Sequence, residues 1–411
     1  MSILPESTKE IIMPKMYPVI QQFSNEKVPD VYYATKLDLE KEEIKNSVKS
    51  GTTAAILVGS RGISGLKHVV KATIDMLLSL GIKPFIIPAM GSHGGGVAEE
   101  QRKIIEGYGI TEEYMGVPIS SSMETVIIGN TPSGIPIHID KIASTADYII
   151  PVCRVKTHTD FDGPIESGLC KMLAIGLGKH NGCSRLHQEG FAEFHKVIPE
   201  VASTIIQLKQ IPFGVAIIEN AHENVNMVKA VLGNKILEEE PKLLNISKSL
   251  MPKLCFEHID VLIIEKIGKD VTGAGMDPNI TGRTCDGIGA SYKGPTITRI
   301  GILDLTEETH NNAVGMGLAD FITRKLYEKI DPISTYTNAI ASGNPGCANI
   351  PVVLENEKEV MLGAIQTCPK IDVNKAKVVK IKDTLHLINI EVSESLIPYC
   401  RSNEKFIVTE I

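Results

Sequence analysis

Two short apolar runs, each followed by a glycine-rich loop and a helical pattern, constrain the fold of this chain more than any other feature. Residues 54–58 (AAILV) precede a loop and then apolar residues at helical spacing from Leu66 to Leu77. Residues 84–88 (PFIIP) precede a second glycine-rich loop, at 91–96, and a second helical pattern. Such adjacent strand–helix units predict a parallel sheet with right-handed crossovers. We therefore expect an α/β fold.

The length of the chain predicts two domains, since 411 residues exceed what a single ordinary core organises. A new series of strand patterns begins at 260–266 (DVLIIEK), after the charged, proline-containing region 239–257. We place the domain boundary in that region. The expected division is an N-terminal α/β domain at 1–255 and a C-terminal α/β domain at 256–411, whose closing part packs back on the first.

Other local patterns complete the expected architecture. We expect a hairpin at 126–139, at the edge of the first sheet, and a long helix at 191–208. Further strands are expected at 213–219 and 299–305, and a further helix at 312–329. Both halves are thus expected to be α/β, with mainly parallel sheets.

Composition argues against several classes of partner. The chain carries 42 basic and 49 acidic residues, and no basic run alternates with aromatic residues, so nucleic acid is not an expected partner. No stretch approaches about 18 uninterrupted apolar residues, and residues 1–15 contain no apolar run of signal-peptide length. We therefore expect no membrane partner and a cytoplasmic location. The eight cysteines show no spacing typical of a zinc ribbon or a disulfide scaffold.

Residues 151–187 concentrate basic, imidazole and glycine residues more densely than any other stretch. This stretch follows the apolar run 147–152, which predicts a buried strand, and leads into an apolar-periodic segment at 167–177. In an open α/β sheet, ligands bind in the crevice outside the carboxyl ends of the strands. We therefore expect His158, in the connecting loop, to stand at such a crevice.

Three loops that follow three parallel-type strands carry Arg61, His93 and His158, so all three side chains are expected to face one crevice. The glycine-rich loops before the helices also offer backbone N–H groups and a positive dipole end, which suit phosphate or carboxylate. A single glycine-rich turn before a helix is more often only a tight turn. Their convergence at matching strand ends is what favours a binding site.

Lys171 lies among apolar residues of the segment at 167–177. A lysine in such a place usually extends its charge to solvent at the helix edge, but a partly desolvated lysine has a lowered pKa and can serve as a covalent attachment point. His180, His187 and His195 lie seven and eight residues apart, which repeats one helical face. A structural or solvated role is the default for two of these histidines, and the spacing is not typical of zinc.

At these residues the chain resembles the LarA-type lactate racemases, which use a nickel-pincer nucleotide. In that family a loop reading PHxxAGFSGGxK is followed, sixteen residues after its lysine, by a nickel-ligating histidine. Here Ser167 and Gly168 precede Lys171, and His187 lies sixteen residues beyond it. The resemblance implies that Lys171 anchors the cofactor covalently, that Ser167 and Gly168 contact it, and that His187 binds nickel. It also makes His158 the first catalytic histidine.

Two further loops extend the resemblance. Gly91-Ser-His93 is similar to the family's GxHRPxxEE segment, which implies that His93 is the second catalytic histidine and that Gly91 contacts the cofactor. Ser60-Arg61 is similar to the family's DxTRP loop, which implies that Ser60 and Arg61 hold cofactor phosphate or substrate carboxylate. The cofactor would thus be bound by the N-terminal domain.

In the second half, residues 276–283 (MDPNITGR) resemble the family's LDQNxYQ segment, which precedes a substrate-contacting lysine. Asp277 and Asn279 match this segment and are expected to bind substrate. Arg283 is the cation of this loop, and we expect it, or Lys293 further along, to pair with a substrate carboxylate. The residues that replace the family's Tyr, Gln and Lys make lactate itself a doubtful substrate.

The resemblance implies two α/β domains with the active site in the cleft between them, and a racemase or epimerase of a lactate-like or larger 2-hydroxy acid. Hydride would leave C2 and return to either face, while His93 and His158 serve as bases on opposite faces of the substrate; neutral imidazole suits this role near its pKa of about 6.5. Proteins that make and insert the cofactor are the implied partners.

Two readings from other classes stay open on the sequence alone. His93, His158 and His187 could form a three-histidine zinc site that activates water in a hydrolase. The chain could also be a non-catalytic α/β protein that binds a nucleotide or another anion, with Lys171 unmodified. Metal identity in the purified protein separates the first reading from the racemase, and turnover after metal loading separates the second.

Overall fold

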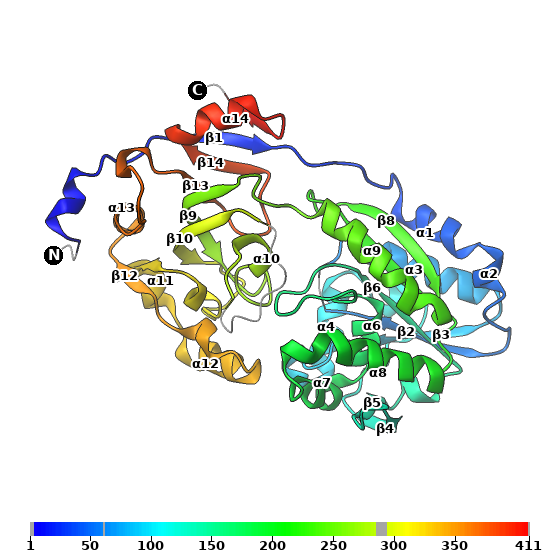
Figure 1. Cartoon of the computed structure of the whole chain (residues 1–411). Helices are drawn as coiled ribbons and strands as arrows, with labels where there is room; N and C mark the ends of the chain where they lie inside the picture. The colour runs from blue at the N-terminus through cyan, green and yellow to red at the C-terminus, as the bar shows by residue number, and fades with distance from the viewer. Residues whose placement is uncertain (1–3, 61, 285–293, 410–411) are drawn as a thin grey trace. The chain divides into compact units, whose positions relative to one another are not determined.

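The computed structural model describes residues 4–60, 62–284 and 294–409 (Figure 1). The chain forms two compact units, one of Asn25–Met251 and one that joins Met1–Ser24 to Pro252–Ile411. Each unit contains a mainly parallel sheet packed with helices, so the predicted α/β fold class is confirmed. The expected boundary at 255 lies next to Pro252, but the first 24 residues belong to the second unit and not, as expected, to the first.

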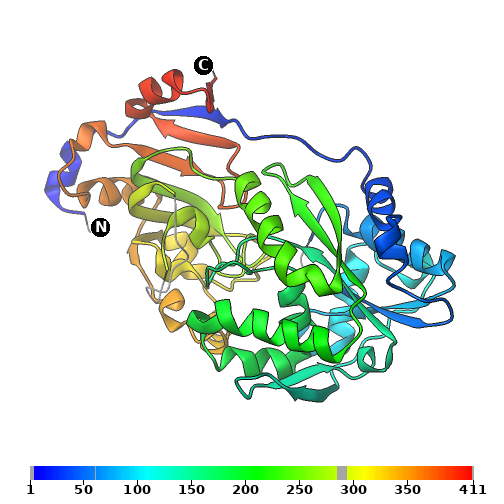
Figure 2. The same ribbon diagram turned by 45° about the vertical axis from the view of Figure 1, so that its right-hand side comes forward.

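Strand β1 (Met16–Gln21) explains this difference. It pairs antiparallel with β14 (Asn389–Ser393) on one side and with β15 (Phe406–Val408) on the other. Both views show the blue N-terminal strand beside the red C-terminal segments (Figures 1 and 2). No local pattern couples segments this far apart in sequence, so a reading of the chain in order assigns β1 to the wrong unit.

The sheet of the first unit has the strand order β3-β2-β6-β7-β8. The first four strands are parallel and β8 is antiparallel to β7. The strands are β2 (Thr53–Val58), β3 (Lys83–Pro88), β6 (Tyr148–Arg154), β7 (Phe213–Glu219) and β8 (Val225–Leu232). β2, β6 and β7 are almost wholly buried, as expected for strands covered by helices on both faces.

Helices cover both faces of this sheet. One face packs against α1 (Val31–Leu39), α3 (Leu66–Ser79) and α4 (Ala98–Gly107). The other packs against α6 (Leu169–Lys171) with its π-helical continuation (Met172–Gly176), α7 (Lys179–His187), α8 (Phe194–Leu208) and α9 (Ile236–Leu250). Two one-turn helices, α2 (Glu42–Lys45) and α5 (Glu112–Met115), lie in the connections. The long helix expected at 191–208 is confirmed as a short 3-10 turn followed by α8.

The expected hairpin at 126–139 forms, as β4 (Thr125–Asn130) and β5 (Pro136–Asp140), but it does not extend the main sheet. It is a separate two-stranded sheet. The alternating apolar residues Ile137 and Ile139 of β5 belong to the core beneath α7 and α8. Because packing against helices already buries this apolar face, the hairpin needs no place at the sheet edge.

The second unit has one eight-stranded sheet in the order β12-β11-β10-β9-β13-β14-β1-β15. Its first five strands are parallel and the others antiparallel. The remaining strands are β9 (His258–Ile267), β10 (Thr296–Leu305), β11 (Phe321–Thr323), β12 (Val352–Leu354) and β13 (Val378–Ile381). The helices are α10 (Pro278–Thr281), α11 (Arg324–Lys329), α12 (Pro332–Ala341), α13 (Glu357–Gln366) and α14 (Ile397–Ser402).

The single helix expected at 312–329 is wrong. The segment forms turns and a 3-10 helix, then β11 and α11. Gly315 has a φ of 99°, and a Cβ on Gly317 would lie 2.1 Å from the carbonyl oxygen of Gly346. These glycines serve close backbone packing, which a continuous helix would prevent. Within the described residues, no helix is long and apolar enough to cross a lipid bilayer.

Candidate functional site

The loops after β2 and β3 meet at the carboxyl edge of the first sheet. β2 pairs in parallel with β3 on one side and β6 on the other, so the three strands end at the same edge. The hydroxyl of Ser60, after β2, is hydrogen-bonded to Nδ1 of His93, after β3. The expected meeting of these two loops is therefore observed. Arg61, predicted to bind phosphate or carboxylate, lies outside the described residues.

The loop around His93 is shaped by glycine and held by one buried amide. Gly94, Gly95 and Gly96 all have positive φ, between 63° and 67°, where other residues are strained. Gln101 of α4 is fully buried, and its Nε2 donates to the carbonyls of Gly91 and His93, each at 2.9 Å. The ring of His93 is exposed. Gly91, expected at the cofactor, packs here against Cys183 of α7.

His158 lies in a loop that is tied to a buried carboxylate. Its backbone N–H donates to Oε2 of Glu166 at 2.7 Å, and its Nδ1 accepts from the N–H of Asp160 at 3.1 Å. A neutral ring held in this way carries its proton on Nε2. The imidazole lies 4.5 Å from the ring of Phe161 and 6.1 Å from that of Phe191, measured between centroids. Nε2 is thus the ring nitrogen of His158 whose hydrogen is available to another group.

His187, at the end of α7, contacts the same aromatic cluster. Its ring lies 5.4 Å from Phe191 and 5.3 Å from Phe194. Its Nδ1 lies 2.6 Å from the carbonyl oxygen of Cys183, which can only accept, so Nδ1 carries the proton and Nε2 carries the lone pair. A backbone carbonyl on the second nitrogen is a typical partner of metal-binding histidine. His187 therefore has the tautomer that a metal ligand needs.

The positive charge of Lys171 has a small effect on the pKa of His187. Burial lowers the pKa of His187 and the positive charge of Lys171 adds to this, but the thiol and carbonyl of Cys183 outweigh both and leave the pKa above its ordinary value. The side chain of Lys171 is half-buried, at the start of the π-helical turn 172–176. Such turns occur frequently at functional sites. The segment expected to be helical at 167–177 thus brings Lys171 within electrostatic range of the candidate nickel ligand.

Ser167 and Gly168 support the segment that bears Lys171. Ser167 exchanges two backbone hydrogen bonds with Lys156, at 2.8 and 3.2 Å, and so closes the His158 loop. A Cβ on Gly168 would lie 2.3 Å from Oε1 of Glu240, a carboxylate on α9. Oε2 of Glu240 accepts from the N–H of Cys170 at 2.8 Å. These contacts give Ser167 and Gly168 a structural role in the loop. Their contact with a cofactor stays a prediction.

Glu240 is a functional candidate that the sequence reasoning missed. It is 1% exposed, and burial raises its pKa to about 7 against the opposing hydrogen bonds from Cys170. A second residue of α9, Lys248, lies 2.6 Å from Oε1 of Glu166 and 3.1 Å from Oδ1 of Asp162. Both residues lie on a helix with a charged stretch, where solvated side chains are the ordinary expectation, so no sequence pattern distinguishes them.

Lys179 was missed as well. It is fully buried at the start of α7, with a φ of 52°, and its Nζ lies 3.2 Å from Oδ2 of the fully buried Asp140. Burial lowers the pKa of Lys179, and the carboxylate of Asp140 opposes this. The same Nζ reaches Oε1 of Gln101 at 3.5 Å. No motif distinguishes these three residues, because they meet only in the folded chain.

The residues predicted to bind substrate lie in the second unit. Asp277 is buried and caps α10, and its Oδ1 accepts from both the backbone and side-chain N–H groups of Asn279, at 2.8 and 2.9 Å. Nη2 of Arg283 donates to the carbonyl of Thr298 at 2.9 Å and pairs with Asp320 at 3.1 Å. Each of the three thus has a structural partner within its own unit. Lys293, the other predicted cation, lies outside the described residues.

A three-histidine zinc site is not formed by His93, His158 and His187. Across residues 4–60, 62–284 and 294–409, no three His, Cys, Asp or Glu side chains are grouped as metal binding requires. A single protein ligand such as His187 does not depend on such a group.

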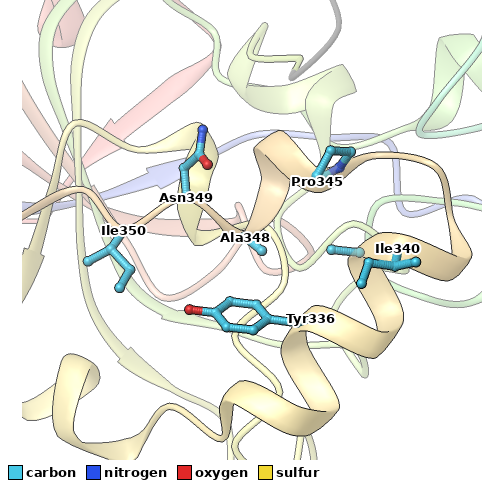
Figure 3. Close-up of a pocket in the computed structure, with 7 residues that line it drawn as sticks. Tyr336, Ile340, Pro345, Ala348, Asn349 and Ile350 are labelled. Carbon is cyan, nitrogen blue, oxygen red and sulfur yellow. The ribbon is translucent and has the colours of Figure 1, made fainter.

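An apolar pocket of about 480 Å³ lies in the second unit (Figure 3). It is formed by α12 and the segment that follows it, and its lining residues are Tyr336, Ala339, Ile340, Pro345, Ala348, Asn349 and Ile350. None of the residues predicted for the site lines it. The pocket holds no titratable group except the phenol of Tyr336, so it offers little for acid–base or metal chemistry.

The chain is similar to one known protein family and to solved structures. Residues 5–197 match the lactate racemase N-terminal domain family. The lactate racemase apoprotein from Thermoanaerobacterium thermosaccharolyticum is 15% identical, with a TM-score of 0.54 over 91% of this chain and 99% of that one. A structural-genomics protein from Thermotoga maritima is 14% identical, with a TM-score of 0.52 over 79% and 84%. No curated protein matches the chain. The predicted resemblance is confirmed, as that of a distant homologue.

Proposed function

We propose, because the chain is a distant homologue of the lactate racemases, that it is a racemase or epimerase of a lactate-like or larger 2-hydroxy acid. The observation that carries this proposal is the pair Lys171 and His187. They have the family's spacing of sixteen residues, and the Nδ1 of His187 is held by the backbone carbonyl of Cys183. This leaves the Nε2 lone pair of His187 for a metal.

The residues present fit a nickel-pincer nucleotide. Lys171 offers a half-buried amine for covalent attachment, and His187 offers the nickel ligand. Ser60, Arg61 and Gly91, with Ser167 and Gly168, would contact the rest of the cofactor, as the family resemblance implies. When bound, this cofactor supplies a site that accepts hydride from C2 of the substrate and returns it.

The protein's own part of the reaction is proton transfer and orientation. The hydrogen on C2 is barely acidic, whereas the hydroxyl proton can be taken by a neutral imidazole. We assign this task to His93 for one enantiomer and His158 for the other. Each histidine becomes an imidazolium when it takes the proton, and it returns that proton when the keto group is reduced. Arg283, Asp277 and Asn279 would bind the substrate.

The proposal includes a cytoplasmic location and partners that make and insert the cofactor. Its first test is the intact mass and nickel content of protein produced together with a cofactor-making system. We expect added mass on the native chain and none on Lys171→Arg, which keeps the charge but lacks the attaching amine. An unmodified, nickel-free native chain with no turnover would instead favour an anion-binding protein.

The two-base assignment makes a further prediction. His93→Ala and His158→Ala should each abolish complete racemisation, because crossing between enantiomers requires both bases. Loss of a positioned base typically costs about 10²–10⁴-fold. In single-turnover reduction of the cofactor, measured by absorbance, the two variants should prefer opposite enantiomers. Equal reduction by both enantiomers in both variants would show that these histidines are not the bases.

A further inference from the structure

Gln101 connects two elements that the proposed reaction needs. Its amide is fully buried on α4, and its Nε2 donates to the carbonyls of Gly91 and His93, each at 2.9 Å. Its Oε1 faces Nζ of Lys179 at 3.5 Å. Lys179 is the first residue of α7, the helix that ends with His187. One side chain thus joins the backbone at His93 to the start of the helix that carries the candidate nickel ligand.

The orientation of this amide is determined by its neighbours. An ammonium group can only donate, so the side of Gln101 that faces Lys179 must be the oxygen. The NH2 group is then directed at two backbone carbonyls, which can only accept. If the amide oxygen and nitrogen were exchanged, the NH2 group would face the ammonium of Lys179, which is also a donor. The amide oxygen would then face the two carbonyls, which are also acceptors. Only one orientation of the Gln101 amide therefore satisfies all three hydrogen-bonding partners.

Lys179 is itself held by Asp140 and by a hydrogen bond to the carbonyl of Pro88. Both side chains are fully buried, and their charged atoms lie 3.2 Å apart. A fully buried ion pair contributes little net stability compared with apolar residues of similar size, because both charges lose their hydration. We therefore consider what the pair positions. Here it directs a positive charge at the oxygen of Gln101.

We propose that Gln101 is a positioning residue for His93, oriented by the buried pair Lys179–Asp140. The amide holds the loop of three positive-φ glycines in the one conformation that presents the His93 ring to Ser60. The effect on turnover rests on the proposed function, whereas the effect on the loop does not. The two can therefore be tested separately.

The loop is tested by hydrogen–deuterium exchange of the full-length chain without cofactor. In Gln101→Glu, carboxylate oxygens face the two carbonyls, while the contact with Lys179 is kept. In Gln101→Leu, all three contacts are lost. We expect the amides of His93, Gly96 and Val97, which bond within the loop at 3.1 Å, to exchange about tenfold faster or more in both variants. Amides of β6 should keep their native rates.

The matched control is Gln21→Leu in the second unit. Gln21 is 1% exposed, and its Nε2 donates to the carbonyls of Lys253 and Leu387, at 3.1 and 2.6 Å. It is thus the same chemical group, likewise buried and donating to two backbone carbonyls, but it belongs to the other unit. We expect native exchange of the loop in this variant. Loop exchange within about twofold of native in both Gln101 variants, or equal acceleration in β6, would overturn the proposal.

Turnover gives the second readout. With cofactor supplied, Gln101→Glu should lower kcat by about 10–100-fold, the range found when the outer partners that orient metal ligands are removed. KM should change little, because Gln101 does not touch substrate. If the native chain itself fails to racemise any 2-hydroxy acid, the proposed function fails, and the exchange experiment still decides the role of Gln101. Native kcat in Gln101→Glu, beside an active native chain, would refute the positioning role.

Discussion

Glu240→Gln tests whether the buried carboxylate behind the Lys171 segment titrates near neutral pH. Glu240 is 1% exposed, and burial raises its pKa to about 7 from an ordinary value of 4.5. Its Oε2 accepts from the N–H of Cys170, whereas its Oε1 has no hydrogen-bond partner within the described residues. Glutamine keeps an acceptor for Cys170 and removes the charge. The substitution therefore isolates the ionisation.

The sign and size of the effect follow from linkage. A carboxyl group whose pKa is raised in the folded state is more stable there as the neutral acid, so its favourable contribution is complete below pH 4.5. That contribution is lost as the pH rises from 4.5 to about 7. The difference between the two pKa values corresponds to about 3 kcal/mol of unfolding free energy. Glutamine does not ionise, so this loss should be absent in the variant. The unpaired NH2 group of the new glutamine also changes the unfolding free energy, but by an amount that does not vary with pH.

The chain has no tryptophan, so unfolding of the first unit is best followed in urea by pulsed deuterium labelling of β6 peptides. We expect the free-energy difference between Glu240→Gln and the native chain to grow in the variant's favour from pH 4.5 to 7 and to level off above. Glu238→Gln removes an exposed carboxylate from the same helix and controls for net charge. A difference that does not vary with pH would show that Glu240 does not titrate in this range.

Three further predictions concern contacts described above. Gly168→Ala should lower the unfolding free energy of the first unit by about 1–3 kcal/mol in urea, because the new Cβ would meet the carboxylate of Glu240. Lys179→Met should cost about 3–5 kcal/mol by leaving Asp140 buried and unpaired, and adding Asp140→Leu should recover most of that loss in the same assay. Arg283→Ala should raise KM for a 2-hydroxy acid more than it lowers kcat in steady-state kinetics; an unchanged KM for every acid tested would place the substrate carboxylate elsewhere.

The sequence predicts the core of the first unit well because the information is local. Continuous apolar runs of strand length, followed by glycine-rich loops, produce β2 and β3 within one or two residues of the expected bounds. Parallel pairing then brings the loops together, as the contact of Ser60 with His93 shows. Lys171 and His187 are also close in sequence, at the two ends of the helical stretch from α6 to α7, so a local pattern can relate them.

What the sequence does not predict depends on contacts between distant segments. β1 joins the second unit through pairing with β14, nearly the whole chain away. Glu240 and Lys179 are charged residues that local patterns assign to solvent, yet both are buried by elements that meet only in the folded chain. Asp277 and Asn279 match a family segment, but a sequence match cannot reveal that they already bond to each other.

The positions of His158 and Lys171 depend on one helix. Lys248 of α9 pairs with Glu166, which accepts from the N–H of His158, while Glu240 of α9 bonds to Cys170, the neighbour of Lys171. A change on α9 should therefore displace a proposed base and the proposed anchor together. His93 is held separately, through α4. Because the two histidines are held by different helices, a substitution on α9 should disturb His158 and leave His93 in place, whereas a substitution on α4 should do the reverse.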